Sequence, residues 1–204
     1  MNNLEITIDF ASAANNYRRL HGGGIGQAIA KAVGLKTYGL PLTVIDATAG
    51  LGQDAFVLAC LGCKITMLER SPVVAELLAD GLARGLATES VNNIIANMRL
   101  IKTDALDFLN LLAKADYPDV VYLDPMFPPR NKSALVKKEL RILKELVGAD
   151  LDADQLLTVA CKVAKRRIVV KRPKNAPFLN HTPPHSSYIG KANRFDIYMP
   201  TKAS

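Results

Sequence analysis

The stretch VIDATAGLGQDA, residues 44–55, decides the fold. Its first half is a short apolar, β-branched run that predicts a strand, and Gly50, Gly52 and Ala55 then satisfy the pattern G-x-G-x-x-A where a helix begins. Glycines in this context let a ligand approach the backbone closely. Nineteen residues after Gly50, Glu69 ends the next predicted strand, where a carboxylate can accept hydrogen bonds from two ribose hydroxyls. Together these residues predict an adenosine-ribose pocket; the alternative is a tight turn that needs glycine only for steric reasons.

Outward from this stretch, short β-branched runs alternate with longer helical patterns as far as residue 172. This alternation predicts an α/β, Rossmann-like fold with a mostly parallel, doubly wound sheet and helices on both faces. The expected strands are residues 43–47, 64–69, 99–103, 119–123 and 167–171. The expected helices are residues 53–61, 72–84, 105–114, 133–147 and 153–165. Two alternating runs, 187–189 and 194–199, predict a C-terminal antiparallel hairpin that closes one edge of the sheet.

The N-terminal part has a different pattern. Apolar and polar residues alternate over residues 4–10, which predicts a half-buried strand. A linker-like stretch with glycines at 22–24 follows, and then a short helix near residues 26–33. We expect this N-terminal segment, residues 1–40, to cover the ligand site.

The composition is that of a folded domain. Hydrophobic residues at 49% and charged residues at 22% exclude disorder, collagen and coiled coil for the chain as a whole, so we expect residues 1–204 to form a single domain. The chain has 26 Lys and Arg against 19 Asp and Glu, and this excess of positive charge favours a polyanionic partner such as nucleic acid. The apolar runs are shorter than the about 18 residues of a membrane span. Three cysteines and the absence of a signal-peptide pattern favour the cytoplasm.

Carboxylates around the glycine turn favour one of two adenosine-containing cofactors. A dinucleotide would place its pyrophosphate over this turn, where Asp46 and Asp54 would repel it. S-adenosylmethionine carries an ammonium and a sulfonium group, which the same carboxylates attract. At the end of the third strand, Asp104 can accept from the adenine amino group while the backbone of Ala105 donates to the ring. We therefore expect S-adenosylmethionine as the cofactor.

The segment DVVYLDPMFPPR, residues 119–130, ends the fourth predicted strand. An exocyclic amine on a nucleic-acid base is a poor nucleophile because its lone pair is delocalised into the ring, so an enzyme must hold and reshape it. Asp124 can accept one amino hydrogen and the carbonyl of Pro125 the other. Phe127 offers a face on which an extruded base can stack. These three residues are the predicted catalytic group; the alternative is a Pro-rich surface loop.

Basic residues near the strand ends are candidate contacts to nucleic-acid phosphates. The carboxyl ends of parallel strands lie on the ligand side of an open sheet, so basic residues that follow the fourth and fifth strands should meet the substrate there. The predicted contacts are Arg130, Lys132, Lys171 and Arg172, with Arg18 and Arg19 on the N-terminal segment. The alternative for such residues is a solvated surface. We expect no metal, because the pair Cys60 and Cys63 has no second pair of ligands.

Several longer motifs resemble a single family. They are DATAGLGQDAFVLA, LERSPVVAELLADGL, VVYLDPMFPPRNKSALVKKELR, LVGADLDADQLL, VVKRP and RFDIY. The chain resembles, from about Ile8 to Tyr198, the bacterial small-subunit ribosomal RNA guanine-N2 methyltransferase J family. The resemblance implies a class I methyltransferase fold with a final hairpin, S-adenosylmethionine as methyl donor, and a guanine near the 3′ end of the small-subunit RNA as acceptor.

The resemblance also implies a set of cofactor contacts. By position they fall on Gln53, Asp54, Glu69, Arg70, Asp104, Ala105 and Asp124. Many members of the family carry Arg where Gln53 stands, and small hydroxyl residues where Asp104 and Ala105 stand. Members also have an additional N-terminal segment before the part that matches Ile8.

Residues and resemblance together predict S-adenosylmethionine-dependent methylation of the N2 amine of a guanine in small-subunit (16S) ribosomal RNA. The expected partner is this RNA or the assembling 30S particle, without a membrane and without a metal. One alternative is an N6-adenine methyltransferase that acts on DNA or RNA, because similar D-P loops serve that amine. The other is a ribosome-assembly module that binds RNA and has lost turnover.

Overall fold

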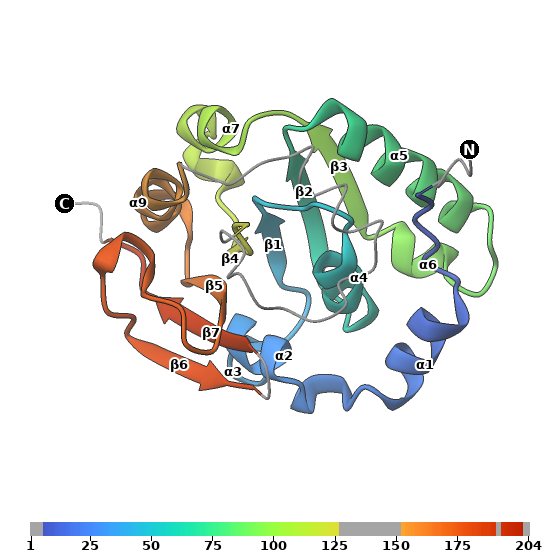
Figure 1. Ribbon diagram of the computed structural model, residues 1–204, viewed down its shortest axis with the longest axis horizontal. Coiled ribbons are helices and arrows are strands. Elements are labelled where there is room, and N and C mark those ends of the chain that lie inside the picture. The colour runs from blue at the N-terminus through green and yellow to red at the C-terminus, as the bar shows by residue number, and fades with distance from the viewer. Residues whose placement is uncertain (1–5, 127–151, 191–192, 202–204) are drawn as a thin grey trace.

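The computed structural model describes residues 6–126, 152–190 and 193–201. Within these ranges, the strands form one sheet of seven in the order β3-β2-β1-β4-β5-β7-β6 (Figure 1). The strands are β1 (Thr43–Asp46), β2 (Lys64–Glu69), β3 (Met98–Lys102), β4 (Val120–Leu123), β5 (Arg167–Pro173), β6 (Ser186–Ile189) and β7 (Asn193–Tyr198). The first five pair in parallel, and the hairpin β6–β7 joins β5 in antiparallel fashion. The predicted α/β fold and its closing hairpin are confirmed.

Helices cover both faces of this sheet (Figure 1). The α-helices are α1 (Ala13–His21), α2 (Ala28–Val33), α3 (Leu35–Tyr38), α4 (Gln53–Cys60), α5 (Pro72–Leu86), α6 (Asn92–Ile95), α7 (Ala105–Leu111) and α9 (Ala153–Val163). Single turns of 3₁₀-helix are η1 (Gly24–Gly26), η2 (Lys114–Asp116) and η3 (Leu179–His181). The predicted strands and helices between residues 43 and 126, and the helix that begins at residue 153, agree with these bounds to within a few residues. The predicted helix 133–147 lies outside the described residues.

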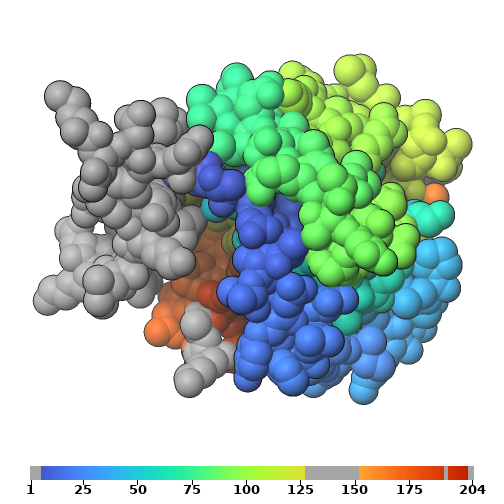
Figure 2. Space-filling view, turned by 90° about the vertical axis from the view of Figure 1, so that its right-hand side faces the viewer, coloured from blue at the N-terminus to red at the C-terminus, as the bar shows by residue number. Residues whose placement is uncertain are grey.

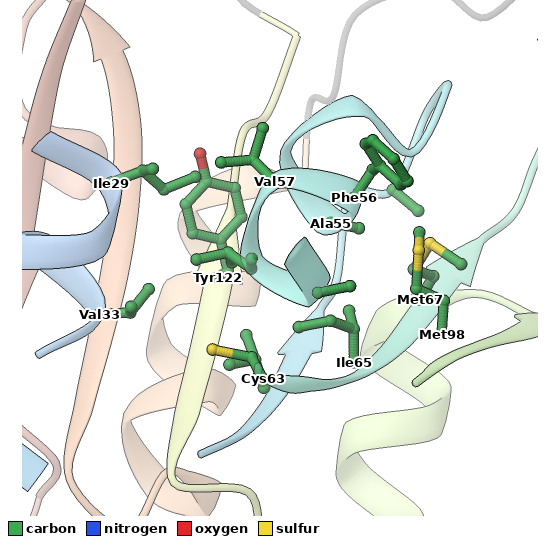
Figure 3. Close-up of a cluster of buried hydrophobic side chains, with 14 of the residues drawn as sticks. Ile29, Val33, Ala55, Phe56, Val57, Cys63, Ile65, Met67, Met98 and Tyr122 are labelled. Atoms are coloured by element: carbon green, nitrogen blue, oxygen red, sulfur yellow. The ribbon is translucent and has the colours of Figure 1, made fainter. Parts of the chain in front are cut away.

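Strand β4 shows how the two faces are built. Successive side chains point to opposite faces of a sheet, so a strand covered on both sides must be apolar throughout. Val120 and Tyr122 belong to the apolar cluster shared with α2, α4 and α5, whereas Val121 and Leu123 belong to the cluster shared with α7 and α9. All four side chains are fully buried. In Figure 3 the ring of Tyr122 lies between side chains of α2 and α4, with its hydroxyl at the end of the cluster.

The predicted strand at residues 4–10 is wrong in its described part, because residues 6–9 carry no strand. The alternation there reflects burial against helices. The ring of Phe10 stacks on Phe56 of α4 with centroids 5.0 Å apart, and Ile8 packs against Gly81 of α5. The stretch expected as a linker contains helix α1, whose N-cap is Ser12. None of the residues of α1 is buried, and its large apolar side chains, Tyr17 and Leu20, are exposed.

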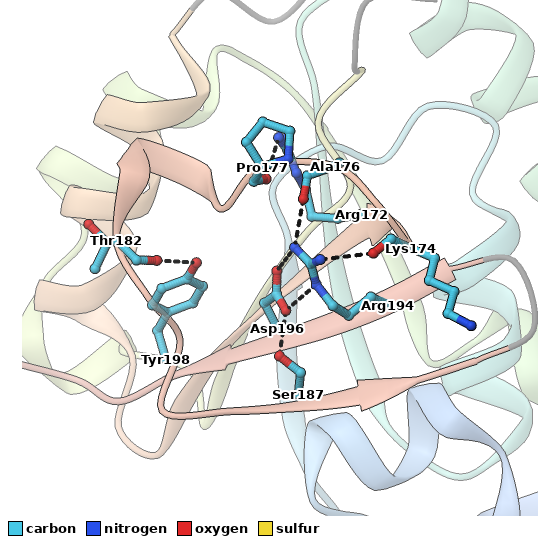
Figure 4. Close-up of polar contacts among 9 residues, drawn as sticks. All are labelled: Arg172, Lys174, Ala176, Pro177, Thr182, Ser187, Arg194, Asp196 and Tyr198. Carbon is cyan, nitrogen blue, oxygen red and sulfur yellow. Dashed lines mark hydrogen bonds and ion pairs between the residues drawn. The ribbon is translucent and has the colours of Figure 1, made fainter. Parts of the chain in front are cut away.

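A buried ion pair fixes the C-terminal hairpin. Asp196 is fully buried in β7 and accepts two hydrogen bonds from Arg194, at 2.7 and 2.8 Å, and one from Ser187 of β6. The guanidinium of Arg194 also donates to the carbonyls of Lys174 and Ala176 (Figure 4). A buried charge pair is tolerated when its remaining donors and acceptors are satisfied in this way. The network ties the loop after β5 to the hairpin and so shapes the end of β5.

The two glycines of the first turn meet different surroundings. Both have positive φ, +51° at Gly50 and +69° at Gly52, which a residue with a side chain adopts only under strain. A Cβ at Gly52 would lie 2.8 Å from Leu78 of α5 and 3.3 Å from Phe10. At Gly50, by contrast, only the carbonyl of Thr48 lies within 4 Å. Gly52 therefore serves packing, and Gly50 leaves space.

Alanine substitutions separate these two effects. We expect Gly52→Ala to lower the free energy of unfolding by about 2 kcal/mol, since strain of about 1–2 kcal/mol adds to the contact with Leu78 and Phe10. Gly50→Ala has the strain alone and should lower it by about 1 kcal/mol. Urea unfolding of both variants measures the difference. Equal losses would contradict the assignment of Gly52 to packing.

Candidate active site

A cavity of about 470 Å³ lies at the carboxyl ends of the central strands. The strand order reverses at β1, whose neighbours β2 and β4 lead away in opposite directions, and in open α/β sheets such a switch point is where ligands bind. The ends of five parallel strands contribute Asp46, Glu69, Thr103, Asp124 and Lys171 to the lining. The cavity is thus formed by residues that are far apart in the sequence and adjacent in the sheet.

Glu69 holds the glycine turn in place. One of its oxygens accepts from the backbone N–H of Gly50 at 2.9 Å, and the other accepts from the N–H of Ser71 at 2.8 Å. The residue is 7% exposed and lies at the end of β2. A carboxylate can accept about four hydrogen bonds, so Glu69 can hold this turn and also accept from the hydroxyls of a ligand.

Charged residues that follow β2 and β3 also line the cavity. Asp104 caps α7, since its Oδ1 accepts from the N–H groups of Leu106 and Asp107 at 2.8 and 3.3 Å. Arg70 lies 3.7 Å from Asp104 and 2.8 Å from Asp152, the residue before α9. These ion pairs link the segments after β2 and β3 to the start of α9 around the cavity.

Three carboxylates and one ammonium group meet at the ends of β1, β4 and β5. Asp54 in the first turn of α4 accepts from the hydroxyl of Tyr122 at 2.7 Å and from Lys171 at 2.6 Å. The same ammonium group donates to Asp124 at 2.9 Å. The backbone N–H of Asp124 donates to the hydroxyl of Thr48 at 2.6 Å. We call Asp46, Asp54, Asp124 and Lys171 the acidic cluster.

Burial changes the protonation of this cluster. Asp46 is 2% exposed, and desolvation together with the charges of Asp54 and Asp124 raises its pKa to about 8. For Lys171, burial lowers the pKa, but the attraction of Asp124 and Asp54 outweighs it and the net pKa lies above the usual range. Burial and the Asp54 charge also raise the pKa of Tyr122 well above its usual value. Lys171 therefore remains a cation and Tyr122 a hydrogen-bond donor.

Most of the predicted cofactor contacts are brought together. The sequence predicted ten cofactor contacts in all, from the glycine turn, the acids and the family resemblance. Nine of them line the cavity: Asp46, Gly50, Gln53, Asp54, Glu69, Arg70, Asp104, Ala105 and Asp124. The tenth, Gly52, is not among the lining residues and packs against Leu78 instead. The predicted catalytic residue Pro125 lines the cavity beside Asp124. Phe127 lies outside the described residues.

The four predicted RNA contacts that the structure describes lie in two places. Lys171 lies in the cavity, and Arg172 is 5% exposed and donates to the carbonyl of Pro177. Arg18 and Arg19 lie on the exposed helix α1 beside α4, in the N-terminal part of the chain that is coloured blue in Figure 2. Arg130 and Lys132 lie outside the described residues. None of the described residues 6–40 is among those that line the cavity. Within this segment Ile8 packs against α5, Phe10 packs against α4, and α2 contacts β5, β6 and β7.

Tyr122 and Thr48 are site residues that sequence reasoning missed. Tyr122 precedes Asp124 by two residues in the run VVYLDP, and residues two apart in a strand point to the same side. That spacing could have placed its hydroxyl near the cluster. Thr48 gave no comparable signal, because its bond to Asp124 joins positions 76 residues apart.

The lining suits a cationic nucleoside better than a dinucleotide. Gly50 offers open space beside the backbone where a Cβ would stand, Glu69 offers acceptors for ribose hydroxyls, and the acidic cluster attracts positive charge. Among the described residues, no group of three or more His, Cys, Asp or Glu is arranged to hold a metal ion. Nor does any helix in the described ranges have the length and apolar character to cross a membrane.

This fold and this lining define the class of S-adenosylmethionine-dependent methyltransferases, and a family model of SAM-dependent methyltransferases matches residues 1–200. Two proteins named ribosomal RNA small subunit methyltransferase J are similar over 195 residues: 55% identity in Aeromonas salmonicida and 57% in Tolumonas auensis, each over 95% of this chain and 77% of the relative. The chain belongs to the ribosomal RNA small subunit methyltransferase J family. A crystal structure of a SAM-dependent methyltransferase from Neisseria gonorrhoeae is 40% identical, with a TM-score of 0.76 over 98% of this chain and 76% of that one.

The raised pKa of Asp46 predicts a pH-dependent stability. The folded protein keeps a proton on Asp46 up to about pH 8, whereas the unfolded chain releases it near pH 4. The contribution of this group to stability is therefore complete below pH 4. It is lost as the pH rises to about 8, at up to about 1.4 kcal/mol per pH unit.

Asp46→Asn removes this dependence. In urea unfolding between pH 4 and 8, we expect the variant to gain stability relative to the wild type as the pH rises. Asp116→Asn, at an exposed position in η2, is the control and should keep a constant difference from the wild type. A constant difference for Asp46→Asn as well would show that Asp46 is ionised in the folded protein.

Glu69 carries the second prediction for this site. Glu69→Ala should weaken S-adenosylmethionine binding by about 2 kcal/mol or more, because hydrogen bonds to a charged acceptor are lost. Titration calorimetry measures the affinity, and thermal unfolding shows whether the glycine turn survives. Glu76→Ala, an exposed carboxylate on α5, is the control and should leave the affinity unchanged. Unchanged affinity in Glu69→Ala would remove Glu69 from the cofactor site.

Proposed function

We propose that this protein transfers the methyl group of S-adenosylmethionine to the exocyclic N2 amine of a guanine in small-subunit ribosomal RNA. Family membership supports the RNA, since the relatives are named for small-subunit ribosomal RNA methylation. The observation that carries the chemistry is Asp124, at the end of β4, whose carboxylate and backbone are both held beside the cavity. The proposed partner is this RNA, free or in the assembling 30S particle, and the proposed compartment is the cytoplasm.

The site can make the guanine amine, a poor nucleophile, able to accept a methyl group. Bound S-adenosylmethionine supplies a sulfonium methyl group, and Glu69, Asp104 and the acidic cluster are the residues that would hold its parts. Asp124 accepts one hydrogen of the guanine amine and the carbonyl of Pro125 accepts the other, so the nitrogen lone pair turns toward the methyl. As the N–C bond forms and the S–C bond breaks, the nitrogen becomes positive, and the charge of Asp124 stabilises it. The surplus proton then leaves the nitrogen through Asp124 to water.

Docking of the RNA requires basic residues outside the cavity. Lys171 and Arg172 make contacts inside the protein. Within the described ranges, Arg18 and Arg19 are the exposed members of the predicted phosphate-binding set, on a helix whose first turn carries no acidic residue. We include Arg130 and Lys132 in the proposed RNA surface on the sequence evidence alone. Contacts of this kind act through release of counterions from the phosphates.

Product analysis tests the reaction. The protein is incubated with labelled S-adenosylmethionine and, in separate reactions, free small-subunit RNA, 30S particles and duplex DNA. We expect label in RNA, and N2-methylguanosine when the digested RNA is analysed by mass spectrometry. N6-methyladenosine would establish the adenine alternative. Binding of cofactor and RNA without transfer would establish the silent assembly module.

Asp124→Asn tests the chemical step. The amide keeps one acceptor oxygen but loses the charge, so the single-turnover rate at saturating RNA and cofactor should fall by about 10²-fold or more. Affinities for S-adenosylmethionine and RNA are measured alongside, and Asp116→Asn is the control at a distant, exposed position. A variant that binds both substrates and transfers at the wild-type rate would remove Asp124 from the mechanism.

A further inference from the structure

Lys171 is the cationic member of the acidic cluster. It extends from β5, the strand beside β4, and its ammonium group joins Asp54 at 2.6 Å to Asp124 at 2.9 Å. The lysine side chain is 21% exposed, whereas that of Asp124 is 40% exposed. The cation therefore lies on the inner side of a carboxylate that faces the cavity.

Asp54 fixes the position of this ammonium group. Its carboxylate is 13% exposed and also accepts from the hydroxyl of the fully buried Tyr122. Tyr122 is clamped in the apolar cluster between α2 and α4 (Figure 3). A chain of contacts thus runs from the core through Tyr122, Asp54 and Lys171 to Asp124. Each link is between 2.6 and 2.9 Å long.

A cation beside Asp124 offsets the negative charges around it. Asp46, Asp54 and Asp124 lie close enough to affect one another, and like charges in a partly buried site favour protonation of one of them. A protonated Asp124 could not act as a charged acceptor for an amine. Lys171 compensates two of these carboxylates directly. The remaining acid, Asp46, is the one that stands deepest, at 2% exposure.

We propose that Lys171 is a positioning residue for methyl transfer: it holds the Asp124 carboxylate in orientation and keeps it ionised toward the amine of the base. The inference rests on the role of Asp124 in the proposed function. It replaces the sequence-based assignment of Lys171 to an RNA phosphate. The two roles differ in what they predict, since a phosphate contact acts on RNA affinity and a positioning residue acts on the rate once RNA is bound.

The experiment compares Lys171→Met with Lys174→Met. Lys174 lies three residues further along, with an exposed side chain and only its backbone carbonyl in the Arg194 network (Figure 4). For each variant, the single-turnover rate at saturating RNA and cofactor is measured from pH 5 to 9, together with RNA affinity at several salt concentrations. In Lys171→Met the rate should fall by about tenfold or more. The acidic limb of its pH profile should move to higher pH, because Asp124 loses the cation that keeps it ionised. Lys174→Met should keep the wild-type rate and profile.

Two further variants separate positioning from folding. Lys171→Arg keeps the charge and should recover part of the rate and the wild-type pH profile. Thermal unfolding shows whether Lys171→Met is folded. If it is not, the double variant Asp54→Asn/Lys171→Met is tested in its place, because it removes one negative and one positive charge and so keeps the net charge of the cluster. Combining Lys171→Met with Asp124→Asn should reduce the rate no further than Asp124→Asn alone, since the lysine acts through that carboxylate.

The outcomes are distinct. An unchanged rate and pH profile, with weaker RNA binding and a salt slope reduced by about one, would assign Lys171 to a phosphate and overturn the inference. Additive losses in the double variant would also overturn it. Failure of the proposed function would show differently, as absence of N2-methylguanosine in the wild-type reaction.

Discussion

The contact on which the site depends is the ammonium group of Lys171 between the carboxylates of Asp54 and Asp124. These partners are 117 and 47 residues away in the sequence, and they meet because β1, β4 and β5 are parallel neighbours whose carboxyl ends share one edge. Without a cation, a partly buried set of carboxylates would repel one another or take up protons. Strands β1, β4 and β5 therefore have to come together with Lys171 in place between the two carboxylates.

The distribution of charge differs between the site and the chain as a whole. The protein carries a formal charge of +7, which suits a polyanionic substrate, yet the inner end of the cavity is acidic. Both features are consistent with one reaction that uses two substrates of opposite charge. A cationic cofactor is attracted to the carboxylates, whereas RNA phosphates are attracted to basic residues elsewhere on the surface.

Rigid surroundings keep the cluster in place. Tyr122 belongs both to the apolar core and to the cluster, so packing of α2 and α4 against β4 determines where its hydroxyl lies. Glu69 ties the glycine turn to β2, and the Arg194–Asp196 pair ties the loop after β5 to the hairpin. Each of these polar contacts is anchored to a strand of the sheet, which restricts the motion of the residues that line the cavity.

Local patterns were enough to predict the alternation of strands and helices, the glycine turn and the acids at Asp46, Glu69 and Asp124. Period-two and helical periodicity, turn chemistry and strand ends are properties of neighbouring residues. The predictions for residues 6–9 and for α1 were wrong. Phe10 is buried against Phe56 of α4, and α1 is an exposed helix, and both outcomes depend on parts of the chain that are distant in the sequence. The partners of Lys171, the burial of Arg172 and the packing role of Gly52 were likewise decided only by the tertiary structure. The sequence cannot distinguish a basic residue at a strand end that is solvated from one that contacts a phosphate or a carboxylate, because only the folded sheet brings those partners within contact distance.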